Sequence, residues 1–169
     1  KEVPKTVTKV VVAEGETKID HFAFFHRKNL TSIKIPNSVT KIGTFAFSNC
    51  ASLTSIEIPN SVTEIGEHAF SDCKNLTSIE IPNSITKIAA YTFCNCTSLT
   101  SVKIPSSVTE IDSYAFDGCV SLTSLEIPNS MTRVWGSSVE GCPKLTLLCK
   151  KGSYADECAR KNHIKVEYI

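Results

Sequence analysis

The chain has 169 residues, about the length of one domain, and its 18 basic and 17 acidic residues give a formal net charge of +1. This balance excludes the basic excess of a typical nucleic-acid-binding protein, and no apolar run reaches the roughly 18 residues that a membrane-spanning helix needs. A hydrophobic content of 41% excludes global disorder. We therefore expect no nucleic-acid partner and no membrane insertion.

The N-terminal residues 1–18 lack the long apolar core of a signal peptide. The chain also begins with Lys1 instead of Met. We interpret it as a trimmed or processed chain.

The rest of the sequence is dominated by an internal repeat. Proline recurs every 23 residues, at Pro36, Pro59, Pro82, Pro105 and Pro128. A leucine column has the same spacing, and so does a phenylalanine column that runs from Phe24 to Phe116. We assign about six 23-residue repeats to residues 7–144 and a C-terminal cap to residues 145–169, which together form a single domain over residues 1–169.

Each repeat is expected to hold one strand and one short helix. Ile33 and Ile35 alternate with Ser32 and Lys34, the pattern of a half-buried strand, and the following proline ends it. In the second half of the unit, apolar residues at 42, 46, 47 and 50 have roughly helical spacing. Glycine at 43 and 66 permits a tight turn before this helix, although Ala, Asp and Trp occupy the same column at 89, 112 and 135.

A unit of this length cannot bury its own apolar face, but stacked copies can. The strands would then form one continuous parallel sheet, with the helices on the other side. The predicted fold is therefore an α/β solenoid.

The cap is expected to be a helix followed by a strand. Ser153 is a candidate N-cap, with acidic residues early and basic residues late in the helix, the order that the helix dipole favours. Alternation over residues 164–169 predicts a final strand. Cys149 and Cys158 lie on different elements of the cap, and a disulfide between them is one of two open interpretations, the other being two ordinary thiols. Trp135 is expected to pack against the cap.

Five cysteines form another repeat column and are expected to be buried, unpaired packing residues. They are Cys50, Cys73, Cys96, Cys119 and Cys142. A column of this kind does not converge on one point, so we predict no metal site and no cofactor.

The recurring pattern LxxIxIPxxVxxIGxxAFxxCxx, seen in full at residues 53–75, resembles the BspA-like (treponemal-type) leucine-rich repeat over about 140 residues. The resemblance implies a right-handed, curved solenoid with the parallel strands on the concave face and short helices on the convex face. It also implies a noncatalytic protein on or outside the cells of bacteria or some protozoa, where the family is linked to adhesion.

Two exposed columns are candidate partner-binding surfaces. The first, which we name the serine–charge face, takes two residues from each strand: Ser32, Lys34, Ser55, Glu57, Ser78, Glu80, Ser101, Lys103, Ser124 and Glu126. The second, the aromatic column, precedes each core phenylalanine by two positions: Phe22, Phe45, His68, Tyr91 and Tyr114. The alternative for the serine–charge face is that it is simply a solvent-exposed sheet surface with no partner. The alternative for the aromatic column is that its side chains pack over neighbouring coils.

No catalytic motif is present, and repetition does not place unlike groups at one point, so we predict no enzyme and no catalytic residues. We expect a monomeric, extracellular or cell-surface module that binds a protein or other cell-surface macromolecule through the concave sheet. The alternatives are a structural spacer that presents other domains and an intracellular interaction scaffold. An ice-binding array is more remote, because the Lys and Glu column interrupts a flat hydroxyl surface.

Overall fold

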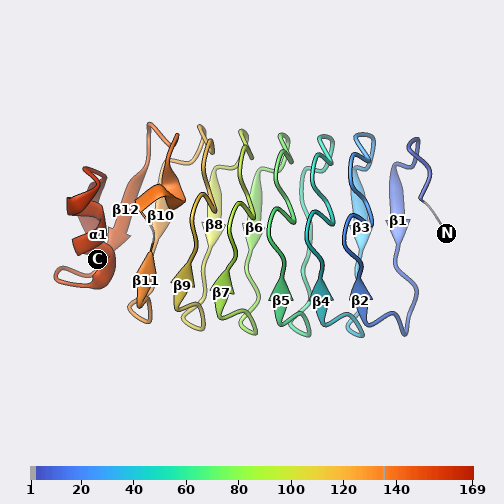
Figure 1. The fold of residues 1–169 in the computed structure, drawn as a ribbon, viewed down its shortest axis with the longest axis horizontal. Helices are drawn as coiled ribbons and strands as arrows, with labels where there is room; N and C mark the ends of the chain where they lie inside the picture. The colour runs from blue at the N-terminus through green and yellow to red at the C-terminus, as the bar shows by residue number, and fades with distance from the viewer. Residues whose placement is uncertain (1–2, 135) are drawn as a thin grey trace.

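The computed structural model describes residues 3–134 and 136–169, so the expectation for Trp135 lies outside the described residues. The chain winds into coils that stack along one axis, with the N-terminus at one end and the cap at the other (Figure 1). We number the coils by their residues: coil 1 (7–29), coil 2 (30–52), coil 3 (53–75), coil 4 (76–98), coil 5 (99–121) and coil 6 (122–144).

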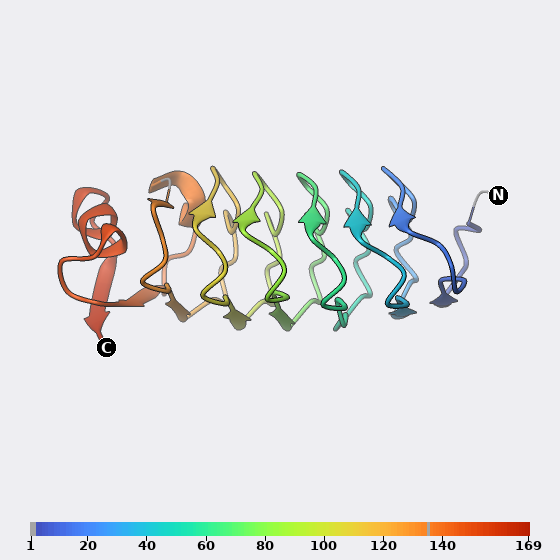
Figure 2. The same ribbon diagram turned by 90° about the horizontal axis from the view of Figure 1, so that it is seen from below.

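The strands lie in two rows, and every pair of strands is parallel. The first row contains β1 (Lys9–Val11), β3 (Ser32–Lys34), β6 (Ser78–Glu80), β8 (Ser101–Lys103), β10 (Ser124–Glu126), β12 (Thr146–Cys149) and β13 (Lys165–Tyr168). The second row contains β2 (Lys18–Ile19), β4 (Lys41–Ile42), β5 (Glu64–Ile65), β7 (Lys87–Ile88), β9 (Glu110–Ile111) and β11 (Arg133–Val134). Figure 2 shows the two rows on different sides of the stack.

The register of the strands follows the repeat. Ser78, Ile79 and Glu80 lie opposite Ser101, Val102 and Lys103, so equivalent residues of successive coils are neighbours. Within these strands the serine and the charged residue are exposed and the residue between them is buried. This alternation confirms the solenoid of parallel strands that the sequence predicts.

One predicted strand is absent from the first row. Residues 55–57 of coil 3 have the same sequence pattern but form no strand, and neither β3 nor β6 pairs with them. The missing strand separates β1–β3 from β6–β8, and a second break, between two strands that are both present, separates β6–β8 from β10–β12–β13.

The short helices expected on a convex face are not confirmed. After β2, β4, β5, β7 and β9 the chain forms consecutive turns, which together with the equivalent part of coil 6 we call the turn side (residues 20–28, 43–51, 66–74, 89–97 and 112–120). Phe45 and Asn49 have φ of 57° and 59°, in the left-handed region that an α-helix cannot include. Alternate amides on this side donate to the next coil, as from Phe47 N to Ala69 O at 2.8 Å, and the amides between them close turns within the coil, as from Ala46 N to Gly43 O at 3.2 Å. Pairing between coils thus replaces pairing within a helix.

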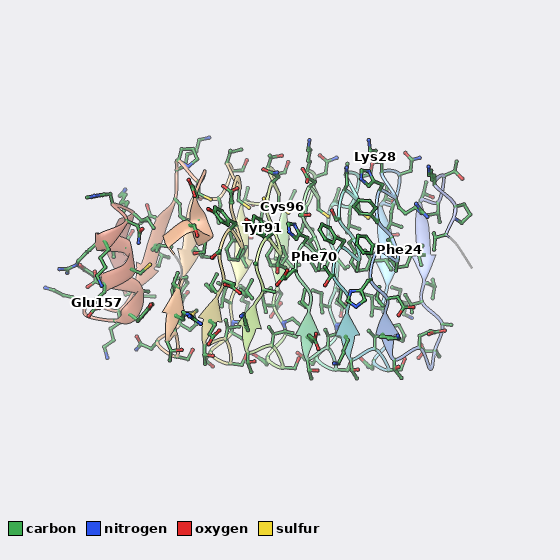
Figure 3. The ribbon with its side chains drawn as sticks, in the orientation of Figure 1. Phe24, Lys28, Phe70, Tyr91, Cys96 and Glu157 are labelled. Atoms are coloured by element: carbon green, nitrogen blue, oxygen red, sulfur yellow. The ribbon has the colours of Figure 1, made fainter. Side chains whose placement is uncertain are left out.

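The core consists of stacked columns. The rings of Phe24, Phe47, Phe70, Phe93 and Phe116 lie nearly parallel, with centroids 5.2–5.6 Å apart. The leucine column, from Leu30 to Leu122, is fully buried beside them. Figure 3 shows Phe24 and Phe70 aligned along the stack. Each coil therefore buries its apolar residues against the same residues of its neighbours.

The stack in Figure 2 is nearly straight, so neither strand row is markedly concave. The surfaces are accordingly named here by their residues. The right-handedness implied by the resemblance stays a prediction. Within the described residues no helix is long and apolar enough to cross a membrane.

The cap forms as the sequence predicts. Helix α1 (Tyr154–Lys161) begins after Ser153, whose hydroxyl accepts a hydrogen bond from the Asp156 amide at 3.3 Å. Strand β13 then pairs with β12 and extends the first row. A short 3₁₀ helix, η1 (Gly136–Val139), occupies the turn side of coil 6.

Candidate functional site

The serine–charge face lies on the outer surface of the first row. All ten of its residues are exposed, whereas the residue between each serine and its charged neighbour is buried. Strand geometry explains this arrangement, because alternate side chains point to opposite faces. The structure thus brings together every residue that the sequence assigned to this surface. Whether the surface binds a partner stays a prediction.

Most charges on this face have no ion pair among the described residues. Lys103 Nζ lies 2.5 Å from Glu80 Oε1, and this pair joins coils 5 and 4. No ion pair is found within the described part of the chain for Lys34, Glu57 or Glu126. Three of the five charges can therefore be satisfied only by solvent or by a partner.

The serine hydroxyls are similarly unengaged, in contrast to the threonines beside them. The Thr31 hydroxyl donates to Thr8 O at 2.9 Å, and the Thr100 hydroxyl donates to Thr77 O at 3.0 Å. For the five serines of the face, the described residues provide no side-chain hydrogen bond. The threonine column therefore stabilises contacts between coils, and the serine column presents free donors and acceptors.

Two hollows deepen the centre of this face. The larger, of about 1080 Å³, lies between residues 33–37 and 57–61 and also contacts Glu14. The smaller, of about 400 Å³, lies between residues 55–60 and 78–83. Both include Glu57, Ile58 and Asn60. They flank the segment of coil 3 that forms no strand, so the missing strand and the hollowed surface coincide. The repeat pattern at residues 55–57 gave no sign of this difference.

The aromatic column forms a continuous stack on the turn side. The centroid distances along it are 5.1, 4.4, 4.5 and 4.9 Å, and all neighbouring planes lie within 15° of parallel. The faces of these rings are therefore covered by one another. Phe22, at the end of the stack, is 52% exposed, and the other four are half-buried. This arrangement favours the covering role and leaves mainly ring edges for a partner.

His68 lies inside this stack, between Phe45 and Tyr91. Burial lowers the pKa of its imidazole, which favours the neutral ring. A neutral ring suits a position between two aromatic faces. The geometry is that of a packing residue.

The cysteine column has a role that the sequence did not reveal. The Cys73 Sγ–H donates to Phe47 O at 3.2 Å, and Cys50, Cys96, Cys119 and Cys142 make the equivalent bond to the phenylalanine 26 residues earlier. Burial raises the pKa of Cys50 to about 12 and that of Cys142 to about 11. These thiols are weak nucleophiles, since the thiolate is the reactive form.

Cys149 and Cys158 are both buried and free in the structure. The Cys158 Sγ–H donates to Val134 O at 3.2 Å, and this contact joins the cap to coil 6. The disulfide remains one of two interpretations, and a thiol count on denatured, unreduced protein distinguishes them. Among the described residues, no group of three or more His, Cys, Asp or Glu side chains is placed to hold a metal ion.

Comparison with known proteins agrees with the repeat analysis. The sequence profile of the BspA type leucine rich repeat region matches residues 17–146 in six copies. This match confirms the resemblance inferred from the sequence. No curated protein sequence matches the chain.

Solved structures share the fold. A T. pallidum leucine rich repeat protein is 30% identical with a TM-score of 0.82, and the match covers 97% of this chain and 86% of that chain. A Eubacterium ventriosum leucine-rich repeat protein is 27% identical with a TM-score of 0.61, over 80% of this chain and 43% of that one. A Faecalibacterium prausnitzii leucine rich cell surface protein is 24% identical with a TM-score of 0.57, over 89% of this chain and 62% of that one. The chain therefore spans less than two thirds of the last two proteins.

Proposed function

Because this chain belongs to the BspA-type leucine-rich repeat family, a class of repeats that generally mediates protein interactions, we propose that its serine–charge face binds a protein or other cell-surface macromolecule. We propose further that it does so outside the cell, as an adhesion module of a secreted or surface protein, and without catalysis. The observation that carries the proposal is the row of exposed, unpaired charges and free serine hydroxyls around two hollows.

Three features of the face support partner binding over a merely solvated surface. The unpaired charges of Lys34, Glu57 and Glu126 are available for complementary charges. The hollows at Ile58 and Asn60 supply concave area that a flat strand row lacks. The inward residues are fully committed to the core, so the outward residues are free to serve a partner.

A binding screen with charge-reversed variants tests this proposal. The wild-type chain is presented to immobilised matrix proteins and cell-surface extracts beside the triple variant Glu57→Lys, Glu80→Lys and Glu126→Lys. A matched control reverses three exposed carboxylates away from the face, at Glu16, Glu67 and Glu140, and so has the same net charge. The proposal predicts that the control binds like wild type and that the face variant loses binding at least tenfold, with equal melting temperatures showing that both are folded.

Other outcomes support the alternatives. Equal binding by all three proteins would indicate that the aromatic column is the binding surface instead. No binding by any of them would support a spacer that presents other domains. A partner found only in cytoplasmic extracts would support an intracellular scaffold.

A further inference from the structure

The junction between coils 3 and 4 lacks strand pairing in both rows. In the second row β5 pairs only with β4, and β7 pairs only with β9. In the first row residues 55–57 form no strand that could pair with β6, and the backbone bond on this side is from Thr77 N to Thr54 O at 3.1 Å, just before β6. Every other junction keeps a pair of strands in at least one row. Figure 1 shows β5 and β7 standing farther apart than their neighbours do.

The missing hydrogen bonds can be identified from the repeat. Gly43 N donates to Ile19 O at 2.8 Å, Gly66 N to Ile42 O at 2.9 Å, and Asp112 N to Ile88 O at 2.9 Å. For the equivalent amide of Ala89, the described residues provide no backbone acceptor. The same holds three residues earlier in the coil. Thr63 N donates to Thr40 O, but among the described residues Thr86 N makes no equivalent bond to Thr63 O.

The break coincides with the end of a glycine column. A Cβ at Gly66 would lie 2.6 Å from Thr44 N, and one at Gly43 would lie 2.6 Å from His21 N, closer than real Cβ atoms approach. The glycines therefore allow coils 1–3 to stack closely. Ala89 is the first residue of this column to carry a Cβ towards a preceding coil, so coil 4 cannot repeat the close approach of coils 1–3. Asp112 also carries a Cβ, yet its amide keeps the bond to Ile88 O, so the ladder is broken only where the glycine-based stacking ends.

A second substitution in coil 4 lies on the same turn. Thr92 is buried in the column where coils 2, 3 and 5 have alanine. Its hydroxyl donates to Ala89 O at 2.7 Å. The turn bonds from Thr92 N to Ala89 O and from Ala115 N to Asp112 O in coil 5 are both 3.4 Å, against 3.2 Å for the bonds to Gly43 O and Gly66 O. The turn of coil 4 is thus locally different from those of coils 2 and 3.

The packing across this junction is looser in the core stack and along the second row, whereas the His68 and Tyr91 rings that cross it on the turn side stay 4.5 Å apart. Phe70 and Phe93 are 5.6 Å apart, against 5.2 Å for the two preceding pairs of the stack. A hollow of about 530 Å³ opens between β5 and β7. The second-row ion pairs on either side of the junction point away from it. Glu64 of coil 3 pairs with Lys41 of coil 2, and Lys87 of coil 4 pairs with Glu110 of coil 5.

We propose that this junction is a hinge, which divides the solenoid into two cooperative blocks: coils 1–3, and coils 4–6 with the cap. The turn side is the pivot, since Phe70 N still donates to Thr92 O at 2.9 Å and Asp72 N to Cys94 O at 2.8 Å. The second row opens, because its ladder is already broken there. In a stack stabilised only by neighbouring contacts, a junction without strand pairing is expected to open before its paired neighbours. The hinge does not depend on partner binding.

Hydrogen exchange measured by mass spectrometry tests the hinge. The hinge predicts that amides of residues 86–89 exchange at least tenfold faster than the equivalent amides of residues 63–66 and 109–112. In Ala89→Gly, which extends the glycine column to coil 4, exchange of this segment should slow toward that of its neighbours. Ala90→Gly is the matched control, because it adds the same backbone freedom one residue away and leaves the Cβ of Ala89 in place.

The reverse substitution, Gly66→Ala, should weaken the strand pairing between coils 2 and 3. Gly66→Ala should make residues 63–66 exchange as fast as residues 86–89, because its Cβ strikes the backbone of coil 2. Equal exchange of the three wild-type segments would overturn the hinge. So would equal effects of Ala89→Gly and Ala90→Gly, and this comparison remains decisive if Gly66→Ala does not fold.

Discussion

The repeat body (residues 7–144) and the cap (residues 145–169) are stabilised in different ways. In the body each contact recurs from coil to coil, so the phenylalanine stack, the leucine column and the thiol bonds are each made several times. In the cap one residue, Asp156, accepts bonds from the Gly152 amide, the Arg160 guanidinium and the Tyr168 hydroxyl. The loss of stability on mutating the body should therefore depend on how central the mutated coil is in the stack. The stability of the cap should depend largely on Asp156 alone.

The largest effect is expected from a central cavity. Phe70 is fully buried between Phe47 and Phe93, whereas Phe24 is 6% exposed and stacks on Phe47 alone. Phe70→Ala should cost about 3–5 kcal/mol of unfolding free energy, and Phe24→Ala clearly less, because it removes contacts to one coil instead of two. Urea unfolding measures both, and equal losses would contradict the nearest-neighbour account.

A smaller, local effect is expected in the cap. Asp156→Asn removes the charge that pairs with Arg160 and should expose helix α1 to exchange while coils 1–5 keep their protection. Glu157→Gln, at an exposed neighbouring carboxylate, is the control and should change nothing. Hydrogen exchange resolves the two regions. Loss of protection throughout the chain would mean that body and cap are not separable.

The same residue makes the cap sensitive to acid. The hydrogen bond from the Gly152 amide, supported by Arg160, holds the pKa of Asp156 below its ordinary value. A lowered carboxyl pKa contributes stability that is complete above the ordinary value near 4 and is lost as the pH falls below it. The cap should therefore loosen below about pH 4 in wild type. In Asp156→Asn, this acid-dependent step should disappear from the exchange of α1.

The smallest effect is expected from high pH, which should lower the stability of the repeat body. Burial raises the pKa of the column thiols, for example that of Cys50 to about 12. A raised thiol pKa contributes stability that is complete below the ordinary value near 9 and is lost as the pH rises above it, at roughly 1 kcal/mol per thiol by pH 10. Cys73→Ala should flatten the decline of stability between pH 8.5 and about 10.5 relative to wild type. An unchanged slope would show that these thiols do not titrate with unfolding.

The sequence predicted the coils well because the repeat spacing itself encodes the stacking. It also predicted the cap helix with Ser153 as its N-cap and the outward direction of Ser78 and Glu80. The cysteine column is buried as predicted except at Cys142, which is half-buried at the end of the column. The turn side was wrongly expected to be helical. Residues with left-handed backbone conformation, such as Phe45 and Tyr91, prevent a helix there. Nothing in these side chains indicates a positive φ.

The hinge and the hollows needed coordinates for a different reason. The change from Gly66 to Ala89 is visible in the sequence, but its effect depends on how near the preceding backbone lies. Residues 55–57 likewise repeat the pattern of their neighbours and differ only in pairing. Such features depend on distances between coils, which a one-dimensional pattern does not contain.

The most direct test of the proposed function is a hydrogen-exchange footprint of the chain in complex with a partner captured in the binding screen. The account predicts that protection is gained at residues 32–37, 55–60 and 78–83, which line the two hollows of the serine–charge face. Protection confined to the turn side around Phe45, His68 and Tyr91, with no change on the first row, would contradict it.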